Sequence, residues 1–195
     1  MFIVIEGPNG VGKTTLCSAL SCRLAEAGES TIVVNEPSDT QFGRPVRSGE
    51  ANLRGRSLAL AVAADRHQQQ ENLVQPLVKA GKTIISDRYV PSSLVLQRID
   101  GMSLEEIWQY NKYLPAADVM FYLDEDATVI QRRVDSRGKK RSRLELEGSA
   151  ERELLLYREA RTFLADESWR QILIACNQRP PEEICEEMVH SLRVM

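Results

Sequence analysis

A glycine-rich loop directly after an apolar run constrains this chain more than any other feature of its sequence. Residues 2–5 read FIVI, and residues 7–14 read GPNGVGKT, a complete G-x-x-x-x-G-K-T pattern. Glycines permit a tight turn whose backbone N–H groups converge on phosphate oxygens, and a helix beginning near Lys13 points its positive end at the same oxygens. A turn that only connects strand and helix is disfavoured, because the preceding strand, the spacing and the following helix agree. The loop therefore predicts a binding site for a nucleoside triphosphate.

The residues of this loop have separate expected roles. Lys13 is expected to reach the β- and γ-phosphates, and the Thr14 hydroxyl is expected to help hold Mg²⁺. The motif says nothing about a second substrate. The residues that we expect to bind ATP are Gly7, Asn9, Gly10, Val11, Gly12, Lys13, Thr14 and Thr15.

Short apolar runs alternate with longer amphipathic stretches along the chain. Strands rich in β-branched or aromatic residues are predicted at 2–5, 31–34, 83–85, 119–123 and 172–175. Helices are predicted at 14–27, 57–80, 126–136, 150–166 and 180–193. Continuous apolar strands that alternate with helices are typical of a parallel sheet covered on both faces. We therefore expect a single α/β domain over residues 1–195, of the P-loop NTPase type with five parallel strands.

An acid and a base follow the predicted strand at 83–85, and ligands of parallel sheets bind at the carboxyl ends of the strands. Asp87 is expected at the same edge as the phosphate loop, where it would hold Mg²⁺ through water as a Walker-B acid does. A turn-forming Asp is the alternative. The neighbouring Arg88 offers a bidentate grip on a second phosphate group. Arg47 and Arg66 are further candidates, although a lone Arg is usually a solvated surface residue.

Seven basic residues crowd into a short stretch ahead of the predicted helix at 150–166. Three interpretations compete: a solvated helix end, a basic lid at about residues 136–148 that closes over a transferring phosphoryl group, and a nucleic-acid-binding patch. The last is disfavoured, because no aromatic residue is interleaved and the net charge is negative. A phosphate loop, a strand-end Asp-Arg pair and this basic segment together favour a kinase over a hydrolytic switch. The seven are Arg132, Arg133, Arg137, Lys139, Lys140, Arg141 and Arg143.

Composition bounds the location and the partners of the protein. The chain has 25 basic and 28 acidic residues, a net charge of −3, which argues against a general nucleic-acid partner. The longest apolar run, at 58–64, is too short to span a bilayer, and no basic segment of a signal peptide precedes the first strand. The four cysteines form no Cys-x-x-Cys pair, so we expect free thiols in a reducing cytoplasm, no membrane partner and no cysteine-bound metal.

Together these motifs resemble those of the thymidylate kinase family, in the family's order, over about residues 2–160. The resemblance implies transfer of the γ-phosphoryl group of ATP to a nucleoside 5′-monophosphate, with dTMP the leading acceptor and dTDP the product. It also implies bound ATP and Mg²⁺ and a homodimer formed by packed helices. The matching stretches are 5–7 (IEG), 12–15 (GKTT), 36–47, 63–66 (AADR), 87–97 (beginning DRY), 123–124 and 137–145.

The resemblance also implies roles for single residues. Glu36 would lie with Asp87 around the metal and the acceptor phosphate, and two arginines would bind that phosphate. Family members whose phosphate loop lacks an Arg supply that charge from the lid, and the loop here has none. The implied acceptor-binding residues are Glu36, Arg47, Val62, Arg66, Arg88 and Gln97, of which Arg66 and Gln97 would read the base edge. The implied catalytic residues are Lys13, Asp87, Arg88, Arg137 and Arg143, and the metal residues are Thr14 and Asp87.

Departures from the family's pattern fall in the acceptor site. Asn9 stands where the family usually has an acid that faces the deoxyribose 3′-hydroxyl, and Asn35 stands where an Arg usually precedes Glu-Pro. Val62 replaces an aromatic that stacks on thymine, and Leu96 replaces a Tyr. Two alternatives to a dTMP kinase stay open: a kinase for a different or modified nucleotide or a nucleoside, and a non-catalytic nucleotide-binding regulator. Lys13, Asp87 and the basic run count against the regulator, because binding alone does not require all three.

Overall fold

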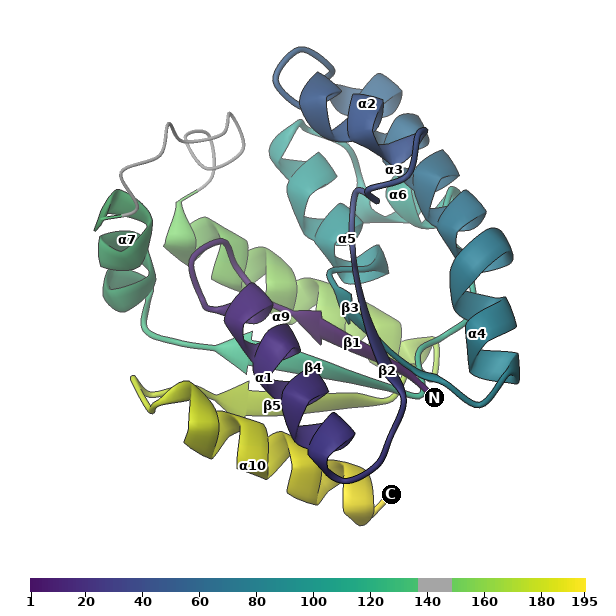
Figure 1. The fold of residues 1–195 in the computed structure, drawn as a ribbon. Helices are drawn as coiled ribbons and strands as arrows, with labels where there is room; N and C mark the ends of the chain where they lie inside the picture. Colours follow the sequence, from purple (N-terminus) through teal and green to yellow (C-terminus); the bar gives the residue numbers. More distant parts are fainter. Residues whose placement is uncertain (137–148) are drawn as a thin grey trace.

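Five parallel strands form one sheet, as predicted, and their observed order is β2-β3-β1-β4-β5 (Figure 1). The computed structural model describes residues 1–136 and 149–195. Each predicted strand is present, and its observed bounds differ from the prediction by one or two residues at a single end. The strands are β1 (Phe2–Glu6), β2 (Thr31–Asn35), β3 (Thr83–Asp87), β4 (Val119–Asp124) and β5 (Gln171–Ala175).

Helices cover both faces of this sheet. Figure 1 shows α1 and α10 together on one side and α5 and α9 together on the other. Within the described residues no helix combines the length and the apolar character needed to cross a membrane. The helices are α1 (Lys13–Glu26), α2 (Gly43–Gly49), α3 (Gly55–Gln69), the π-helical turn η1 (Gln70–Val74), α4 (Gln75–Lys79), α5 (Val90–Ile99), α6 (Leu104–Gln109), α7 (Ala127–Ser136), α9 (Ala150–Asp166) and α10 (Pro181–Arg193).

The alternation of side chains along the strands produces two separate cores. In β1, Ile3 and Ile5 pack with α1 and α10, whereas Phe2 and Val4 pack with the helices of the other face. Successive residues of a strand point to opposite faces, so a strand that is apolar at every position must be covered twice. This burial fixes the carboxyl end of β1, and with it the start of the glycine-rich loop.

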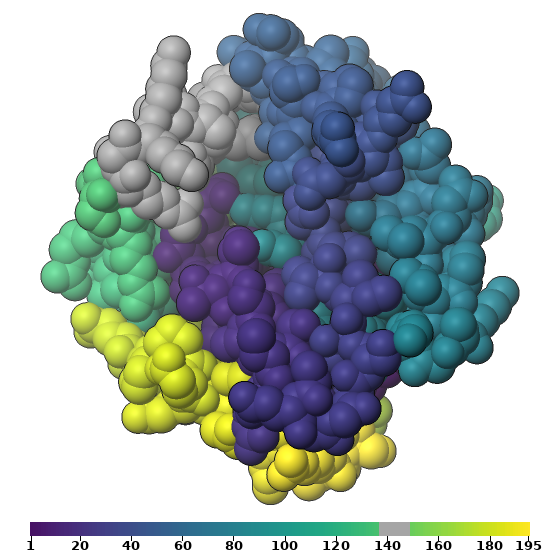
Figure 2. Space-filling view, viewed as in Figure 1, coloured from purple at the N-terminus to yellow at the C-terminus, as the bar shows by residue number. Residues whose placement is uncertain are grey.

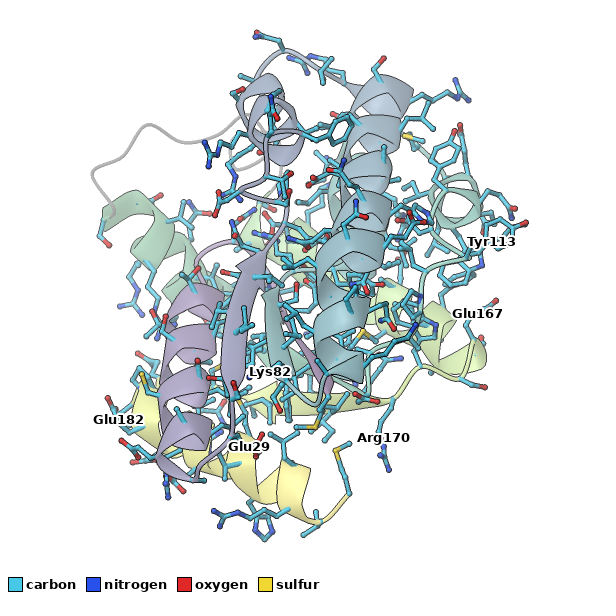
Figure 3. All side chains as sticks on the ribbon, turned by 45° about the vertical axis from the view of Figure 1, so that its right-hand side comes forward. Glu29, Lys82, Tyr113, Glu167, Arg170 and Glu182 are labelled. Atoms are coloured by element: carbon cyan, nitrogen blue, oxygen red, sulfur yellow. The ribbon has the colours of Figure 1, made fainter. Side chains whose placement is uncertain are left out.

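The amino ends of the strands mark the edge of the sheet away from that loop. Glu29, Lys82 and Arg170, labelled in Figure 3, precede β2, β3 and β5. The carboxyl ends therefore all meet at the opposite edge, where the loop after β1 lies. In Figure 2 the surface is hollowed between the atoms of α2 and α3 and those that follow β1.

The helical prediction for residues 57–80 differs from the structure. The segment is helical from Gly55 to Lys79, but the π-helical turn Gln70–Val74 divides it into α3 and α4. A π-turn inserts one residue into the helical repeat, and Pro76 lacks the N–H of a regular helix interior, so it stands in the first turn of α4. Helices α2, α5 and α6 were not predicted. Most residues of α5 are buried, so it carries no apolar stripe with a polar face.

Candidate functional site

The glycine-rich loop adopts a conformation that strongly favours glycine. Gly7 and Gly10 have φ of 146° and 91°, the region that side-chain-bearing residues rarely enter. A Cβ at Gly7 would lie 2.9 Å from the Leu123 carbonyl, and one at Gly10 would lie 2.7 Å from a methyl group of Val134. The loop therefore packs its backbone tightly against β4 and α7. This packing holds its N–H groups at the amino end of α1.

Lys13 is buried at the base of this loop. Its Nζ donates to the carbonyls of Gly7 and Pro8 at 2.7 and 2.9 Å. Burial lowers the pKa of this ammonium to about 7, and the positive charge of Arg88 acts in the same direction. A bound anionic phosphate would raise that pKa again, because an opposite charge favours the charged form. The position suits a lysine that binds phosphate.

Thr14 and Asp87 come together as the sequence predicted. The Thr14 hydroxyl donates to Oδ2 of Asp87 at 2.5 Å. Hydroxyl and carboxylate oxygens are hard ligands of the kind Mg²⁺ prefers, and Mg²⁺ usually adds water and substrate phosphates to one or two protein ligands. The described residues contain no cluster of three or more His, Cys, Asp or Glu side chains that could hold a metal ion by themselves. The pair therefore fits Mg²⁺ that is bound jointly with nucleotide phosphates.

Two cavities meet at the phosphate loop and share Asn9 and Arg88 as a wall. The first, of about 150 Å³, is lined by residues 9, 10, 12–15, 87 and 88. The second, of about 200 Å³, lies beside it and is bounded by α2, α3 and α5. We call the first the phosphate cavity and the second the acceptor cavity. The acceptor cavity is lined by Asn9, Glu36, Pro37, Arg47, Glu50, Val62, Arg66, Arg88, Ser92, Ser93 and Leu96.

A buried ion pair forms one side of the acceptor cavity. Nε of Arg66 donates to Glu36 at 2.7 Å, and its other nitrogens donate to the side chain of Asn111 at 2.5 Å and to the carbonyl of Tyr89 at 3.2 Å. Burial raises the pKa of Glu36 to about 7, against the opposing charge of Arg66. Glu36 lines the acceptor cavity with Arg66 and does not line the phosphate cavity with Asp87.

The other predicted acceptor residues divide into two groups. Arg47 and Val62 line the cavity with Arg66 and Arg88, and Val62 lies one helical turn before Arg66 on α3. Arg47 donates to the carbonyl of Pro37. Gln97 is buried in α5 and does not line the cavity. The structure thus brings four of the predicted side chains to one cavity with Glu36, and Gln97 is not among its lining residues.

Sequence reasoning missed Glu6, which lies beneath the loop that carries Arg88. Glu6 is 0% exposed and accepts hydrogen bonds from the N–H of Tyr89 at 2.7 Å, the hydroxyl of Ser92 at 2.8 Å and the hydroxyl of Tyr157 at 3.0 Å. Arg88 has φ of 81°, unusual for a residue with a side chain, and such a conformation persists where the surroundings enforce it. An acid at the end of an otherwise apolar strand was the signal.

Glu153 was missed as well. It is 2% exposed and accepts from the backbone N–H of Asn9 at 2.8 Å and from Nδ2 of Asn9 at 3.0 Å. Nη2 of Arg88 donates to Oδ1 of Asn9 at 2.6 Å. Glu153 shares the buried face of α9 with Tyr157, Ala160 and other apolar residues. A carboxylate in that apolar stripe was a signal for a polar partner across the interface.

A third cavity, of about 360 Å³, lies on the other side of the phosphate loop. It contains two arginines that were not predicted as site residues. Nη1 of Arg133 donates to the carbonyl of Val11 at 3.3 Å, and Arg179 donates to the carbonyl of Ala175 at 2.6 Å. The cavity is lined by Gly10, Val11, Gly12, Thr15, Leu16, Arg133, Ser136, Cys176, Arg179, Pro181 and Ile184. Arg137 and Arg143, which were expected to act on the transferring phosphoryl group, lie outside the described residues.

Comparison with known proteins agrees with this geometry. A family model described as thymidylate kinase matches residues 5–187. A probable thymidylate kinase of Pyrococcus abyssi is 35% identical over 145 residues, 70% of this chain and 71% of that protein. A probable thymidylate kinase of Thermococcus kodakarensis is 35% identical over 148 residues, 70% and 72% of the two chains. A thymidylate kinase of Xanthomonas euvesicatoria is 32% identical over 154 residues, 78% and 68% of the two chains.

Proposed function

Because this chain belongs to the thymidylate kinase family, we propose that it phosphorylates dTMP to dTDP with ATP as the phosphoryl donor. Its enzyme class is that of a nucleoside monophosphate kinase. The observation that carries the proposal is the wall of Asn9 and Arg88 common to the phosphate cavity and the acceptor cavity. A wall shared in this way lets the terminal phosphate of one nucleotide meet the phosphate of another without crossing bulk water.

The donor binds along the glycine-rich loop in this proposal. Backbone N–H groups and the Lys13 ammonium hold the β- and γ-phosphates, and Thr14 and Asp87 hold Mg²⁺ with them. When bound, Mg²⁺ supplies positive charge to the phosphate oxygens and orients them. The adenosine occupies the third cavity, whose apolar Pro181 and Ile184 suit a base and whose Arg133 and Arg179 suit its polar edge.

The acceptor binds in the acceptor cavity with its phosphate toward Arg88. Arg88 and Arg47 bind that phosphate, because a guanidinium matches phosphate oxygens with two parallel donors. The base lies against Val62 and Leu96, with the Arg66 guanidinium at its polar edge. Arg66 suits this role because three hydrogen bonds already fix its orientation, so little conformational entropy is lost on binding.

The reaction needs alignment and positive charge more than covalent participation by the protein. An oxygen of the dTMP phosphate forms a bond to the γ-phosphorus of ATP. The bond from that phosphorus to the β–γ bridging oxygen breaks, and ADP leaves with the electron pair. Lys13 and Arg88 stabilise the charge that spreads over the oxygens in the transition state. Arg137 and Arg143 remain expected contributors from the sequence.

A panel of acceptors tests this function. Mg²⁺-dependent ADP release from ATP is measured with each nucleoside monophosphate and with thymidine, using Lys13→Ala as the control. We expect strong turnover with dTMP and a large loss of kcat in the control. Turnover with another nucleotide or a nucleoside alone would contradict dTMP as the acceptor. ATP binding without any turnover would indicate a regulator.

The aliphatic side chains of Val62 and Leu96 in the acceptor cavity favour one variation of this function. Val62 and Leu96 form the apolar wall where the family carries aromatics, so a base would meet aliphatic side chains there. A modified pyrimidine is therefore the second acceptor to include in the panel. A homodimer and a cytoplasmic location complete the proposal, and sedimentation analysis of the purified protein tests the dimer.

A further inference from the structure

We propose that Glu153 of α9 is a positioning residue for the phosphoryl transfer, and that it acts through the side chain of Asn9 on Arg88. The inference rests on the proposed function for its kinetic consequence and on the contacts of these residues for its geometry. Glu153 lines neither the phosphate cavity nor the acceptor cavity, whereas Asn9 and Arg88 line both. Glu153 therefore acts from behind the wall that the two cavities share.

The hydrogen bonds allow the Asn9 amide one orientation. Both carboxylate oxygens of Glu153 are engaged, one by the backbone N–H of Asn9 at 2.8 Å and the other by its Nδ2 at 3.0 Å. A carboxylate only accepts hydrogen bonds, so the amide nitrogen must face Glu153 and the amide oxygen must face away. That oxygen accepts from Nη2 of Arg88 at 2.6 Å. Glu153 thus orients the Asn9 amide so that its oxygen, and not its nitrogen, faces Arg88.

Because Glu153 is buried, breaking its hydrogen bonds to Asn9 costs free energy. Glu153 is 2% exposed, and a buried carboxylate that loses its hydrogen-bond donors is strongly unfavourable. The negative charge of Glu153 also acts on Lys13, which lines the phosphate cavity. Burial lowers the pKa of Lys13, and the negative charge of Glu153 is among those that oppose this lowering. A residue that served only to fill space on this face of α9 would be apolar, as Leu156, Ala160 and Leu164 are.

The same face of α9 supports Arg88 a second time. Tyr157 lies four residues after Glu153, which places both side chains on one side of the helix. Its hydroxyl lies 3.5 Å from Nη1 of Arg88 and donates to Glu6 at 3.0 Å. Nη1 also donates to the hydroxyl of Ser92 at 2.9 Å. The guanidinium is therefore held on one nitrogen by Asn9 and on the other by Ser92 and Tyr157.

Exchanging the acid and the amide between positions 9 and 153 tests the proposal. In Glu153→Gln an N–H of the new amide must face a donor of Asn9. Either the Asn9 side-chain amide then turns over, or its hydrogen bond to residue 153 breaks. We expect kcat/KM for the acceptor to fall about tenfold to a hundredfold, the cost of one hydrogen bond to a charged group. Asn9→Asp places a second carboxylate against Glu153, and the two must share a proton. Its activity relative to wild type should increase as the pH falls.

The double variant Asn9→Asp/Glu153→Gln restores every donor and acceptor. The carboxylate introduced at position 9 accepts from Arg88 and from the amide introduced at position 153. The oxygen of that amide accepts from the backbone N–H of position 9. We expect kcat/KM of the double variant to return to within about threefold of wild type. Glu151→Gln is the matched control, because it removes the same charge from an exposed position in the same turn of α9. It should leave kcat/KM unchanged.

A double variant as weak as the weaker single variant would overturn the proposal, and so would an active Glu153→Gln that equals wild type in kcat/KM. A crystal structure of Glu153→Gln adds a measurement that requires no turnover. Displacement of Arg88 from Asn9 is expected, and an unchanged contact between them would overturn the proposal whichever acceptor the enzyme uses. Failure of the proposed function is a different result, namely wild-type protein that does not turn over dTMP.

Discussion

Replacing Arg66 by methionine will destabilise the folded protein by about 3–5 kcal/mol at pH 8. Arg66 is 1% exposed and donates to Glu36, to Asn111 and to the carbonyl of Tyr89. Methionine fills much of the same volume, yet it leaves the Glu36 carboxylate buried without a partner charge. The buried acceptors of Glu36, Asn111 and Tyr89 that lose their donor therefore cost more than the lost packing.

The loss of stability will depend on pH with a definite sign. Removing Arg66 will raise the pKa of Glu36, which burial already raises to about 7, still further. A carboxyl whose pKa is higher in the folded than in the unfolded chain contributes stability that is lost as the pH rises. In the wild type, the free energy of unfolding stops falling near pH 7, where Glu36 becomes ionised in the folded protein. In the variant it continues to fall above pH 7, by about 1.4 kcal/mol per pH unit. The variant will therefore be about 1.4 kcal/mol more destabilised at pH 8 than at pH 6.

Urea unfolding followed by circular dichroism at both pH values measures this difference. The double variant Glu36→Gln/Arg66→Met should recover a large part of the loss, because it removes the buried charge along with its partner. Arg56→Met is the matched control, since Arg56 in its ion pair with Glu106 is 74% exposed and should contribute far less. An Arg66→Met variant whose loss is equal at the two pH values, with no recovery in the double variant, would refute the reasoning.

Three further predictions concern ligand binding. Burial and the charge of Arg88 hold the pKa of Lys13 at about 7, so ATP binding at pH 8 should take up a proton, and the affinity for ATP should fall as the pH rises above 7. Calorimetry in buffers of different ionisation enthalpy measures the proton uptake. ATP binding without proton uptake would contradict this prediction. Val62→Phe should lower KM for dTMP by restoring a stacking surface worth about 1–3 kcal/mol, and an unchanged KM would remove Val62 from the base site. Asp87→Asn should raise the Mg²⁺ concentration needed for half-maximal turnover, and an unaltered Mg²⁺ dependence would separate Asp87 from the metal.

Much of the fold followed from local sequence patterns. The five strands were predictable because each is rich in β-branched or aromatic residues, which is typical of strands in a covered parallel sheet. The phosphate loop was predictable because its glycines, its lysine and its flanking elements stand in one short segment. Helix α5 was not, since burial around most of its surface removes the stripe from which helices are recognised.

The candidate site was predictable where residues follow strand ends and unpredictable where partners come from distant helices. Thr14 and Asp87 were expected together and are hydrogen-bonded. The partnership of Asn9 with Glu153 spans 144 residues, and no local pattern encodes such a contact. Gln97 was selected by resemblance alone; it lies one helical turn after Ser93 on α5 but is buried and is not among the residues that line the cavity.

A crystal structure with ATP and dTMP joined through their phosphates into one inhibitor tests the central claim most directly. We predict that the phosphate chain runs from the glycine-rich loop past Lys13 to Arg88, with thymine against Val62 and its polar edge toward Arg66. A thymidine group bound elsewhere, with Arg88 making no contact to the phosphate chain, would contradict the account.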